Sequence, residues 1–271
     1  MTELAERARR FLGLHQAGRP LLMPNPWDRG SAVLLASLGF EALATTSSGF
    51  AATLGRLDGS VTRDEALEHA AAIAAATELP VSADLENGFA DAPDAVAETV
   101  RLAIGTGLAG CSIEDFTGRD DDPIYDLGVA AERVAAAAQA ARAGPLVLTA
   151  RAENHVRGRP DLADTIARLQ AYQEAGADVL FAPGLSRLED IREVVASVDR
   201  PVNVLARPGA PSVTELAEAG VSRISVGGAF AFAALGAVVE AAGELMGPGT
   251  YRFWERAGVG VRAARSAFSG P

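Results

Sequence analysis

The stretch PVSADLENGFADAPDAVAETVRLAIGTGLAGCSIED, residues 80–115, indicates the fold class of the chain. It opens with the short apolar run Pro80–Asp84, continues through a helical pattern over residues 92–106, and closes with a second apolar run, Gly110–Glu114. Short apolar runs bounded by Gly or Pro are typical of strands that are buried on both faces, and such strands are usually parallel and joined by helices. The stretch therefore predicts a strand–helix–strand unit.

The same alternation runs along the whole chain. Strands are predicted at Pro20–Pro24, Glu41–Thr46, Pro80–Asp84, Gly110–Glu114, Pro145–Arg151, Asp178–Phe181, Pro201–Leu205 and Ser222–Val226. Helices are predicted near residues 28–38, 64–77, 92–106, 128–143, 161–175, 187–197, 212–219 and 228–245. Eight such units in this order predict an α/β fold, the (β/α)8 TIM barrel. A doubly wound open sheet is the alternative, but it usually has fewer units and a GxGxxG motif after its first strand, which this chain lacks.

Local signals mark several helix ends. Thr62 with Glu65 and Ser212 with Glu215 have the spacing of capping boxes. The strings LASLGF, QEAGAD and AEAGVS each place a glycine directly after a predicted helix, where a left-handed residue is favoured. An extra helix is expected over residues 2–17, and we expect residues 1–271 to form a single domain because no linker or internal repeat interrupts the pattern.

Composition excludes several classes of function. The 271 residues carry 24 basic and 35 acidic side chains, for a net charge of −11, and a pI near 4.8 argues against nucleic acid or an anionic membrane as partner. Every basic residue is arginine, so Schiff-base aldolases, pyridoxal-phosphate enzymes and P-loop nucleotidases, which need a lysine amine, are excluded. The charged N-terminus is not a secretory signal, and the longest uncharged run, Ile224–Val239, is short for a membrane span. We expect a cytoplasmic protein.

Acidic side chains gather at the predicted carboxyl ends of the strands, where the active site of such barrels lies. Asp84 and Glu86 follow the third strand, Glu114 ends the fourth, and Arg151 ends the fifth, with Glu153 just beyond it. Oxygen ligands without nearby histidine or cysteine favour Mg²⁺, or Mn²⁺, over zinc. Strand alternation places Ser82 and Ser112 on the same side as these acids, and turns Cys111, the single cysteine, toward the helices as a buried apolar residue.

Four strings together resemble one enzyme family. They are SSGFAATLGRLD (47–58), ADLENGF (83–89), GCSIED (110–115) and LTAR (148–151), and the chain is similar to the isocitrate lyase/phosphoenolpyruvate mutase superfamily from about Pro24 to Glu240. The combined spacing is specific, although each string alone is weak.

The resemblance implies roles for individual residues. It places the metal site on Asp84 and Glu86 with Glu114, and an outer role on Asp58. It places the substrate carboxylate on the backbone amides of Thr46, Ser47 and Ser48. The predicted catalytic residues are Arg151, Glu114 and Asp58, and the predicted substrate-binding residues are Trp27, Thr46, Ser47, Ser48, Asp84 and Arg151.

The chain also departs from the best-known members of that superfamily. Isocitrate and methylisocitrate lyases carry K-[KR]-C-G-H on the loop after the fourth strand, where this chain reads FTGRDDDPIYDLG (116–128). Phosphonomutases use a loop lysine and a histidine after the sixth strand, which here ends in Ala182-Pro183. The chain therefore looks like a branch that acts on simple 2-oxo acids, such as the oxaloacetate decarboxylases or hydrolases.

These observations predict a Mg²⁺-dependent lyase that cleaves a C–C bond of a small 2-oxo acid or related carboxylate through a chelated enolate. A non-catalytic 2-oxo-acid-binding protein on the same scaffold stays open, because the missing lysine, cysteine and histidine leave no obvious general acid. A phosphoenolpyruvate phosphonomutase is the third alternative, and the lysine-free loop disfavours it.

The C-terminal tail predicts a homo-oligomer. Tyr251, Phe253 and Trp254 follow a predicted hinge at Pro248-Gly249 and precede the amphipathic stretch Val259–Phe268. The family resemblance implies a tetramer in which C-terminal helices are exchanged between subunits. A barrel already covered by eight helices would leave these aromatics without a place to pack, so burial in a neighbouring subunit is favoured over packing on the same barrel.

Overall fold

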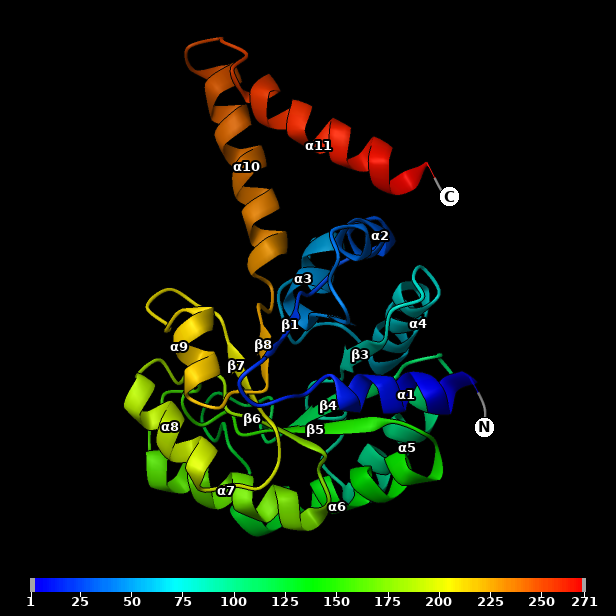
Figure 1. Cartoon of the computed structure of the whole chain (residues 1–271), viewed down its shortest axis with the longest axis vertical. Coiled ribbons are helices and arrows are strands. Elements are labelled where there is room, and N and C mark those ends of the chain that lie inside the picture. The colour runs from blue at the N-terminus through cyan, green and yellow to red at the C-terminus, as the bar shows by residue number, and fades with distance from the viewer. Residues whose placement is uncertain (1–2, 270–271) are drawn as a thin grey trace.

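A computed structural model describes residues 3–269, and its eight parallel strands form a nearly closed barrel (Figure 1). The hydrogen-bonded order is β1-β8-β7-β6-β5-β4-β3-β2, and the Ala44 amide donates to the Pro24 carbonyl at 3.1 Å across the remaining gap. The predicted TIM barrel is thereby confirmed. The strands are β1 Leu21–Met23, β2 Leu43–Ala44, β3 Val81–Asp84, β4 Gly110–Glu114, β5 Val147–Arg151, β6 Val179–Phe181, β7 Val202–Leu205 and β8 Arg223–Ser225.

Helices alternate with these strands as the sequence predicts. The predicted capping boxes at Thr62 and Ser212 are present, and Gly39, Gly176 and Gly220 adopt positive φ angles of 91°, 106° and 84° after their helices. One short helix, α3, was not predicted, and the predicted N-terminal helix is α1, with residue 2 outside the described part. The helices are α1 Glu3–Gly13, α2 Arg29–Ser37, α3 Ser47–Thr53, α4 Arg63–Ala74, α5 Pro93–Ile104, α6 Leu127–Ala143, α7 Leu162–Ala175, α8 Leu188–Ala196, α9 Val213–Glu218, α10 Ala229–Met246 and α11 Phe253–Phe268.

Two apolar clusters stabilise the barrel. The larger lies between the strands and the surrounding helices and includes Cys111, which is fully buried as predicted. The smaller includes Leu21, Val147 and Val179 with Phe11 of α1, so the N-terminal helix contributes to the apolar packing inside the barrel. A Cβ at Gly110 would lie 2.9 Å from the Phe11 ring and 2.7 Å from the Val147 carbonyl oxygen, so only glycine fits there.

The helix after β8 departs from the prediction. The helix predicted near residues 228–245 is present as α10, but its expected position over the barrel was wrong: α10 stands away from the barrel, and α11 folds back to contact α2 (Figure 1). Ala231 is the only buried residue of α10. On β1, Leu22 is 41% exposed between its buried neighbours Leu21 and Met23. The sequences of β8 and α10 are both compatible with an eighth strand and an eighth helix packed on the barrel. The chain between the two elements instead leads α10 away from it.

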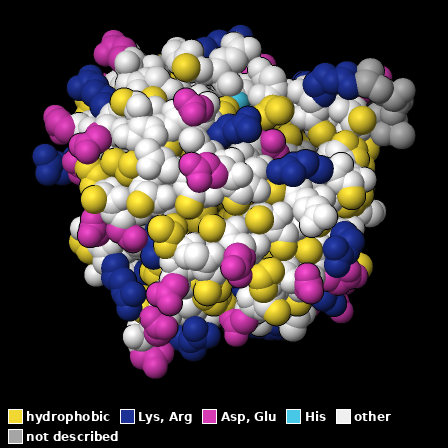
Figure 2. Space-filling model, turned by 90° about the horizontal axis from the view of Figure 1, so that it is seen from below, with side chains coloured by type: hydrophobic (Ala, Val, Ile, Leu, Met, Phe, Trp, Pro, Cys, Tyr) yellow, Lys and Arg dark blue, Asp and Glu magenta, His cyan; other side chains and the backbone are white. Residues whose placement is uncertain are grey.

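The exposed α10 is apolar along most of its length. By length and composition it is the one helix in residues 3–269 that could cross a membrane, with only 6% of it buried. The surface at the bottom of the molecule is different, since Figure 2 shows acidic and basic side chains interspersed there among apolar ones. The apolar exposure of α10 therefore needs a partner surface to explain it.

Candidate active site

A cavity of about 200 Å³ opens at the carboxyl ends of the strands. Strand alternation brings Ser82, Asp84, Ser112 and Arg151 to its wall, as predicted. The other strands and the segments that follow them add residues that were not predicted as site residues. These are Met23, Asn25, Thr45, Phe181, Asn203, Leu205, Arg223, Ser225, Gly227 and Gly228.

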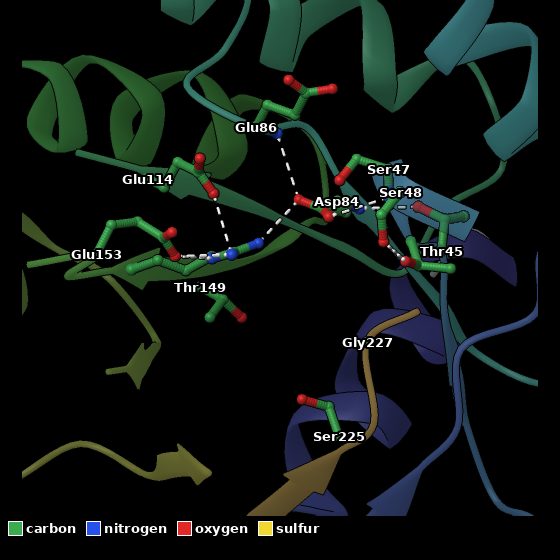
Figure 3. A network of polar contacts seen from close by, with 12 residues as sticks. Thr45, Ser47, Ser48, Asp84, Glu86, Glu114, Thr149, Glu153, Ser225 and Gly227 are labelled. Carbon is green, nitrogen blue, oxygen red and sulfur yellow. Dashed lines mark hydrogen bonds and ion pairs between the residues drawn. The ribbon is translucent and has the colours of Figure 1, made fainter. Parts of the chain in front are cut away.

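The opening of this cavity, at the carboxyl ends of the strands, is the mouth of the barrel. Arg151 is at the centre of the ion pairs there. Its guanidinium lies 3.0 Å from the Asp84 carboxylate, 3.1 Å from that of Glu114 and 2.7 Å from that of Glu153. Figure 3 shows Asp84, Glu114 and Glu153 joined by dashed lines that converge between them. Burial lowers the pKa of Arg151, but Glu114, Glu153 and Asp84 outweigh that effect and leave the pKa well above its usual value. The mouth therefore carries a fixed cation among an excess of carboxylates.

Glu86 and Glu114 are held in an environment that disfavours their charge. Burial, then the charges of Asp84 and Asp58, raises the pKa of Glu86 to about 8. Burial also raises the pKa of Glu114 well above its usual value, although Arg151 opposes this. Both side chains face a second cavity of about 90 Å³, together with Asp58 and Arg157. A cation placed near these oxygens would relieve the repulsion among them.

The predicted metal ligands do not form a closed cluster. No group of three Asp, Glu, His or Cys side chains within residues 3–269 is arranged to hold a metal ion. Arg151 lies between Asp84 and Glu114, and Figure 3 shows the Glu86 carboxylate apart from both. Mg²⁺ usually keeps several waters and takes one or two protein carboxylates, so these side chains could hold that ion with Asp84 as the carboxylate that contacts it.

The segment Thr46–Ser48 begins α3 rather than an open loop. Thr46 is the N-cap and its hydroxyl accepts from the Gly49 amide at 3.4 Å, while the Ser47 amide donates to Asp84 at 3.3 Å. The Thr45 hydroxyl accepts from the Asp84 amide at 2.9 Å. This segment thus fixes Asp84 as well as lining the cavity, and Figure 3 shows Ser47 and Ser48 beside it.

Trp27 lies elsewhere than expected. It was predicted to bind substrate, but it lines a separate apolar cavity with Ala231 and Leu235 of α10. Asp58, by contrast, reaches both cavities of the mouth although it comes from an exposed turn.

Several supporting residues had no predicted role. Glu153 stands two residues after Arg151, and its amide donates to the buried Asp115 carboxylate at 2.8 Å. Asp115 also accepts from Arg168 at 3.1 Å and from Tyr172 at 2.5 Å, which fixes the end of β5. Arg157 lies 3.4 Å from Glu153 and over the Phe116 ring at 3.5 Å. The only sequence signal for this network was the run of charges after β5.

Comparison with known proteins identifies the family. The model of the phosphoenolpyruvate phosphomutase family matches residues 11–246. A protein of known structure from Burkholderia cenocepacia J2315, provisionally named a lyase/mutase, is 52% identical, with a TM-score of 0.95 over 100% of this chain and 99% of that one.

Named lyases are also similar. The 2-methylisocitrate lyase of Bacillus subtilis is 30% identical over 74% of this chain and 67% of its own length. The crystal structure of a 2,3-dimethylmalate lyase is 26% identical, with a TM-score of 0.81 over 100% of this chain and 99% of that one. The chain belongs to the phosphoenolpyruvate phosphomutase family of the isocitrate lyase/phosphoenolpyruvate mutase superfamily, as an enzyme of the carbon–carbon lyase type.

Proposed function

We propose that the protein is a Mg²⁺-dependent lyase that cleaves a C–C bond in a small 2-oxo acid or related dicarboxylate. The observation that carries this proposal is the mouth of the barrel, where Arg151 lies among Asp84, Glu114 and Glu153 above a polar cavity of about 200 Å³. A cavity of that size suits a molecule of a few carbon atoms. Phosphonopyruvate hydrolase, which shares this fold at 22% identity, has been crystallised with oxalate and Mg²⁺.

The carboxylates suit Mg²⁺, with Mn²⁺ as the alternative. Asp84 would hold the ion directly, and Glu86, Glu114 and Asp58 would hold its waters. Bound there, Mg²⁺ would polarise the substrate carbonyl and stabilise the negative charge that develops when the adjacent C–C bond breaks.

The chain's own residues then orient the substrate. The Arg151 guanidinium can donate to a substrate carboxylate or to the oxygen that becomes negative, because its ion pairs hold it at the cavity wall. Asp115 positions Glu153, and Glu153 in turn fixes Arg151 through hydrogen bonds of 3.1 and 2.7 Å. The Thr46–Ser48 segment adds hydroxyl groups on the opposite wall.

Turnover assays separate this proposal from its alternatives. Oxaloacetate, 2-methylisocitrate and related acids are incubated with protein that has been treated with EDTA, with and without restored Mg²⁺. We expect product only when Mg²⁺ is present. Turnover that persists in EDTA contradicts the proposal. Tight binding without product across the panel indicates the non-catalytic 2-oxo-acid-binding protein. Conversion of separately added phosphonopyruvate to phosphoenolpyruvate indicates the phosphonomutase.

Asp84→Ala tests the metal assignment directly. We expect loss of Mg²⁺ binding and of activity with an unchanged circular dichroism spectrum, because Arg151 keeps Glu114 and Glu153 as partners. Asp64→Ala, which removes an exposed carboxylate from α4, is the matched control and should keep both. An unfolded Asp84→Ala protein would mean that Asp84 is structural.

The two C-terminal helices, α10 and α11, form an arm that stands away from the barrel. We propose that this arm is exchanged between subunits of a homo-oligomer, a tetramer. On α10, Val238, Val239 and Met246 are 65%, 72% and 81% exposed, while Leu22 of β1 lacks a covering helix. Burying several large apolar side chains in a neighbouring subunit contributes about 1.5–3 kcal/mol each.

Light scattering on a Val238→Asp/Val239→Asp double variant tests the exchange. We expect the wild-type protein to have the mass of a tetramer and the variant to have a lower mass. Val156→Asp, at an exposed valine outside the arm, is the control and should leave the mass unchanged. An unchanged mass in the double variant contradicts the exchange, and a wild-type protein that disperses only in detergent would indicate a membrane partner for α10.

A further inference from the structure

Arg223 is a buried arginine on the cavity wall, and the proposed reaction does not use it. Arg223 belongs to β8 and lines the same cavity as Ser225, while Ile224 between them packs into the outer apolar cluster. The Arg223 side chain therefore points into the barrel. TIM barrels normally fill this interior with layers of branched apolar residues, so a guanidinium here is unusual.

Arg223 is buried without a negative partner. It is 3% exposed, and no ion pair to it is found within residues 3–269. Its guanidinium contacts the His15 Nε2 atom at 3.2 Å and donates to the Thr149 hydroxyl at 3.2 Å. The Arg223 Nε atom is buried and has no hydrogen-bond partner.

The floor beneath Arg223 is neutral. The His15 Nδ1 atom lies 2.9 Å from the Phe11 carbonyl oxygen and donates to it, which leaves Nε2 as an acceptor for Arg223. Burial and then the charge of Arg223 lower the pKa of His15 to about 3, so the imidazole stays neutral. Burial and then the charge of Arg151 lower the pKa of Arg223 to about 9, so the guanidinium is still a cation at neutral pH.

A second orphaned polar group lies on the same wall. Asn203 is 1% exposed, and its Oδ1 atom has no partner, although Nδ2 donates to the Ser225 hydroxyl at 2.9 Å. Rotating the amide by 180° would turn its N–H donors toward the cavity, and the Ser225 hydroxyl could then donate instead of accept. Ser82, Ser112 and Thr149 add further hydroxyls to this part of the barrel, and Figure 3 shows Thr149 and Ser225 below the carboxylates of the mouth.

The charges of the cavity are thus separated along its depth. Three carboxylates surround Arg151 at the mouth, whereas Arg223 has only neutral partners below. A buried cation is costly unless an anion pairs with it, and Arg223 and Asn203, which each carry an unpartnered buried polar atom, both line a cavity that a small ligand can enter.

We propose that Arg223, held by Thr149 and with Asn203 beside it on the cavity wall, binds a second carboxylate of the substrate in the interior of the barrel. The substrate is then a dicarboxylate that reaches from Arg151 at the mouth to Arg223 below. Thr149 stands two residues before Arg151 on β5, a rise of about 6–7 Å along the strand, which suits an acid of about three to five carbon atoms. This deepens the proposed function, since it takes the mouth as the binding site and adds a required second anionic group.

Binding rather than turnover provides the test, so that its failure is distinct from failure of the proposed reaction. Calorimetry with Mg²⁺ present measures the affinity of oxalate, which occupies the mouth alone, and of malonate, succinate and glutarate, each compared with its monoamide. We expect at least one diacid to bind roughly tenfold or more tightly than its monoamide. Equal affinity of every diacid and its monoamide would overturn the proposal.

Arg223→Met then tests whether Arg223 causes the preference for diacids over their monoamides. We expect this variant to bind oxalate as the wild type does and to bind diacids no better than monoamides, while Arg223→Lys keeps part of the preference. A preference for diacids that survives in Arg223→Met would place the second carboxylate elsewhere and overturn the assignment. If Arg223→Met does not fold, Arg223→Gln, which keeps hydrogen-bonding groups without the charge, carries the same comparison.

A stability measurement separates a binding role from a structural one. Arg133 is also fully buried and its Nε atom likewise has no partner, but its terminal nitrogens donate to three backbone carbonyl oxygens, those of Asn87, Ala90 and Asp91, whereas Arg223 reaches only His15 and Thr149. We expect Arg133→Met to lower the melting temperature of the free protein and to keep the diacid preference. Arg223→Met should keep or raise the melting temperature and lose that preference. A fall in melting temperature with the preference intact in Arg223→Met would mean that Arg223 is structural.

Discussion

His15 should make the folded protein sensitive to acid. It is 9% exposed, and burial followed by the charge of Arg223 lowers its pKa from 6.5 to about 3. In the unfolded chain the imidazole titrates near its ordinary value. Between these two values the unfolded state binds more protons than the folded state, so stability is fully present above about pH 6.5 and is lost progressively as the pH falls.

The size of the effect follows from the two pKa values. At about pH 5 the unfolded imidazole is almost fully protonated and the folded one is neutral, which removes about 2 kcal/mol from the free energy of unfolding relative to about pH 8. A domain of this kind has a total stability of about 5–15 kcal/mol, so the loss is measurable.

His15→Gln isolates this contribution. The Gln amide can donate to the Phe11 carbonyl and accept from Arg223, as His15 does, but it does not titrate. Urea denaturation at about pH 8 and pH 5 gives the free energy of unfolding of both proteins. We expect the variant to lose about 2 kcal/mol less than the wild type over this range.

A second, half-buried histidine provides a test of additivity. His69 stacks on Phe50 at 3.8 Å between ring centroids, and burial lowers its pKa to about 4. His69→Gln should reduce acid sensitivity independently, and the double variant should show the sum of the two effects because the two sites share no partner. Equal losses of stability in the wild type and His15→Gln would refute the reasoning, since His15 would then be charged in the folded state.

Three further predictions concern other buried groups. Burial raises the pKa of the Cys111 thiol to about 12. Ellman's reagent should therefore label no thiol in the native protein and one thiol in guanidinium, and labelling of the native protein would show that β4 opens. Because the pKa of Glu86 is raised to about 8, added Mg²⁺ should release protons near pH 7 in weakly buffered solution, and Glu86→Gln should reduce the release, since the pKa of Glu114 is raised as well. Mg²⁺ binding without proton release in the wild type contradicts this. Gly110→Ala should lower the free energy of unfolding, measured in urea, by about 1–3 kcal/mol because its Cβ would overlap Phe11 and the Val147 carbonyl. The control Gly128→Ala in α6, whose Cβ would meet nothing within 4 Å, should be neutral or stabilising. Equal effects of the two substitutions would contradict the packing.

The sequence determined the parts of this protein that depend on neighbouring residues. Apolar runs bounded by Gly and Pro gave the strands, and Thr62, Ser212 and Gly176 marked helix ends, because capping and left-handed conformations depend on a few adjacent residues. Strand alternation also placed Asp84 and Arg151 at the mouth and buried Cys111, because parallel strands present their carboxyl ends at one rim.

Only the tertiary structure decided how these groups pair and where α10 goes. The partners of Arg151 come from three strands or strand ends, and Arg223 meets His15 across 208 residues of chain. Such contacts depend on the register of the strands in the barrel and on the packing of α1 against the barrel interior. No local sequence pattern encodes either. The sequence of α10 fits a covering helix as well as an arm, since an apolar face looks the same whether its own barrel or a partner buries it. The direction of the chain after Gly228 separates the two, and that is a property of the folded molecule.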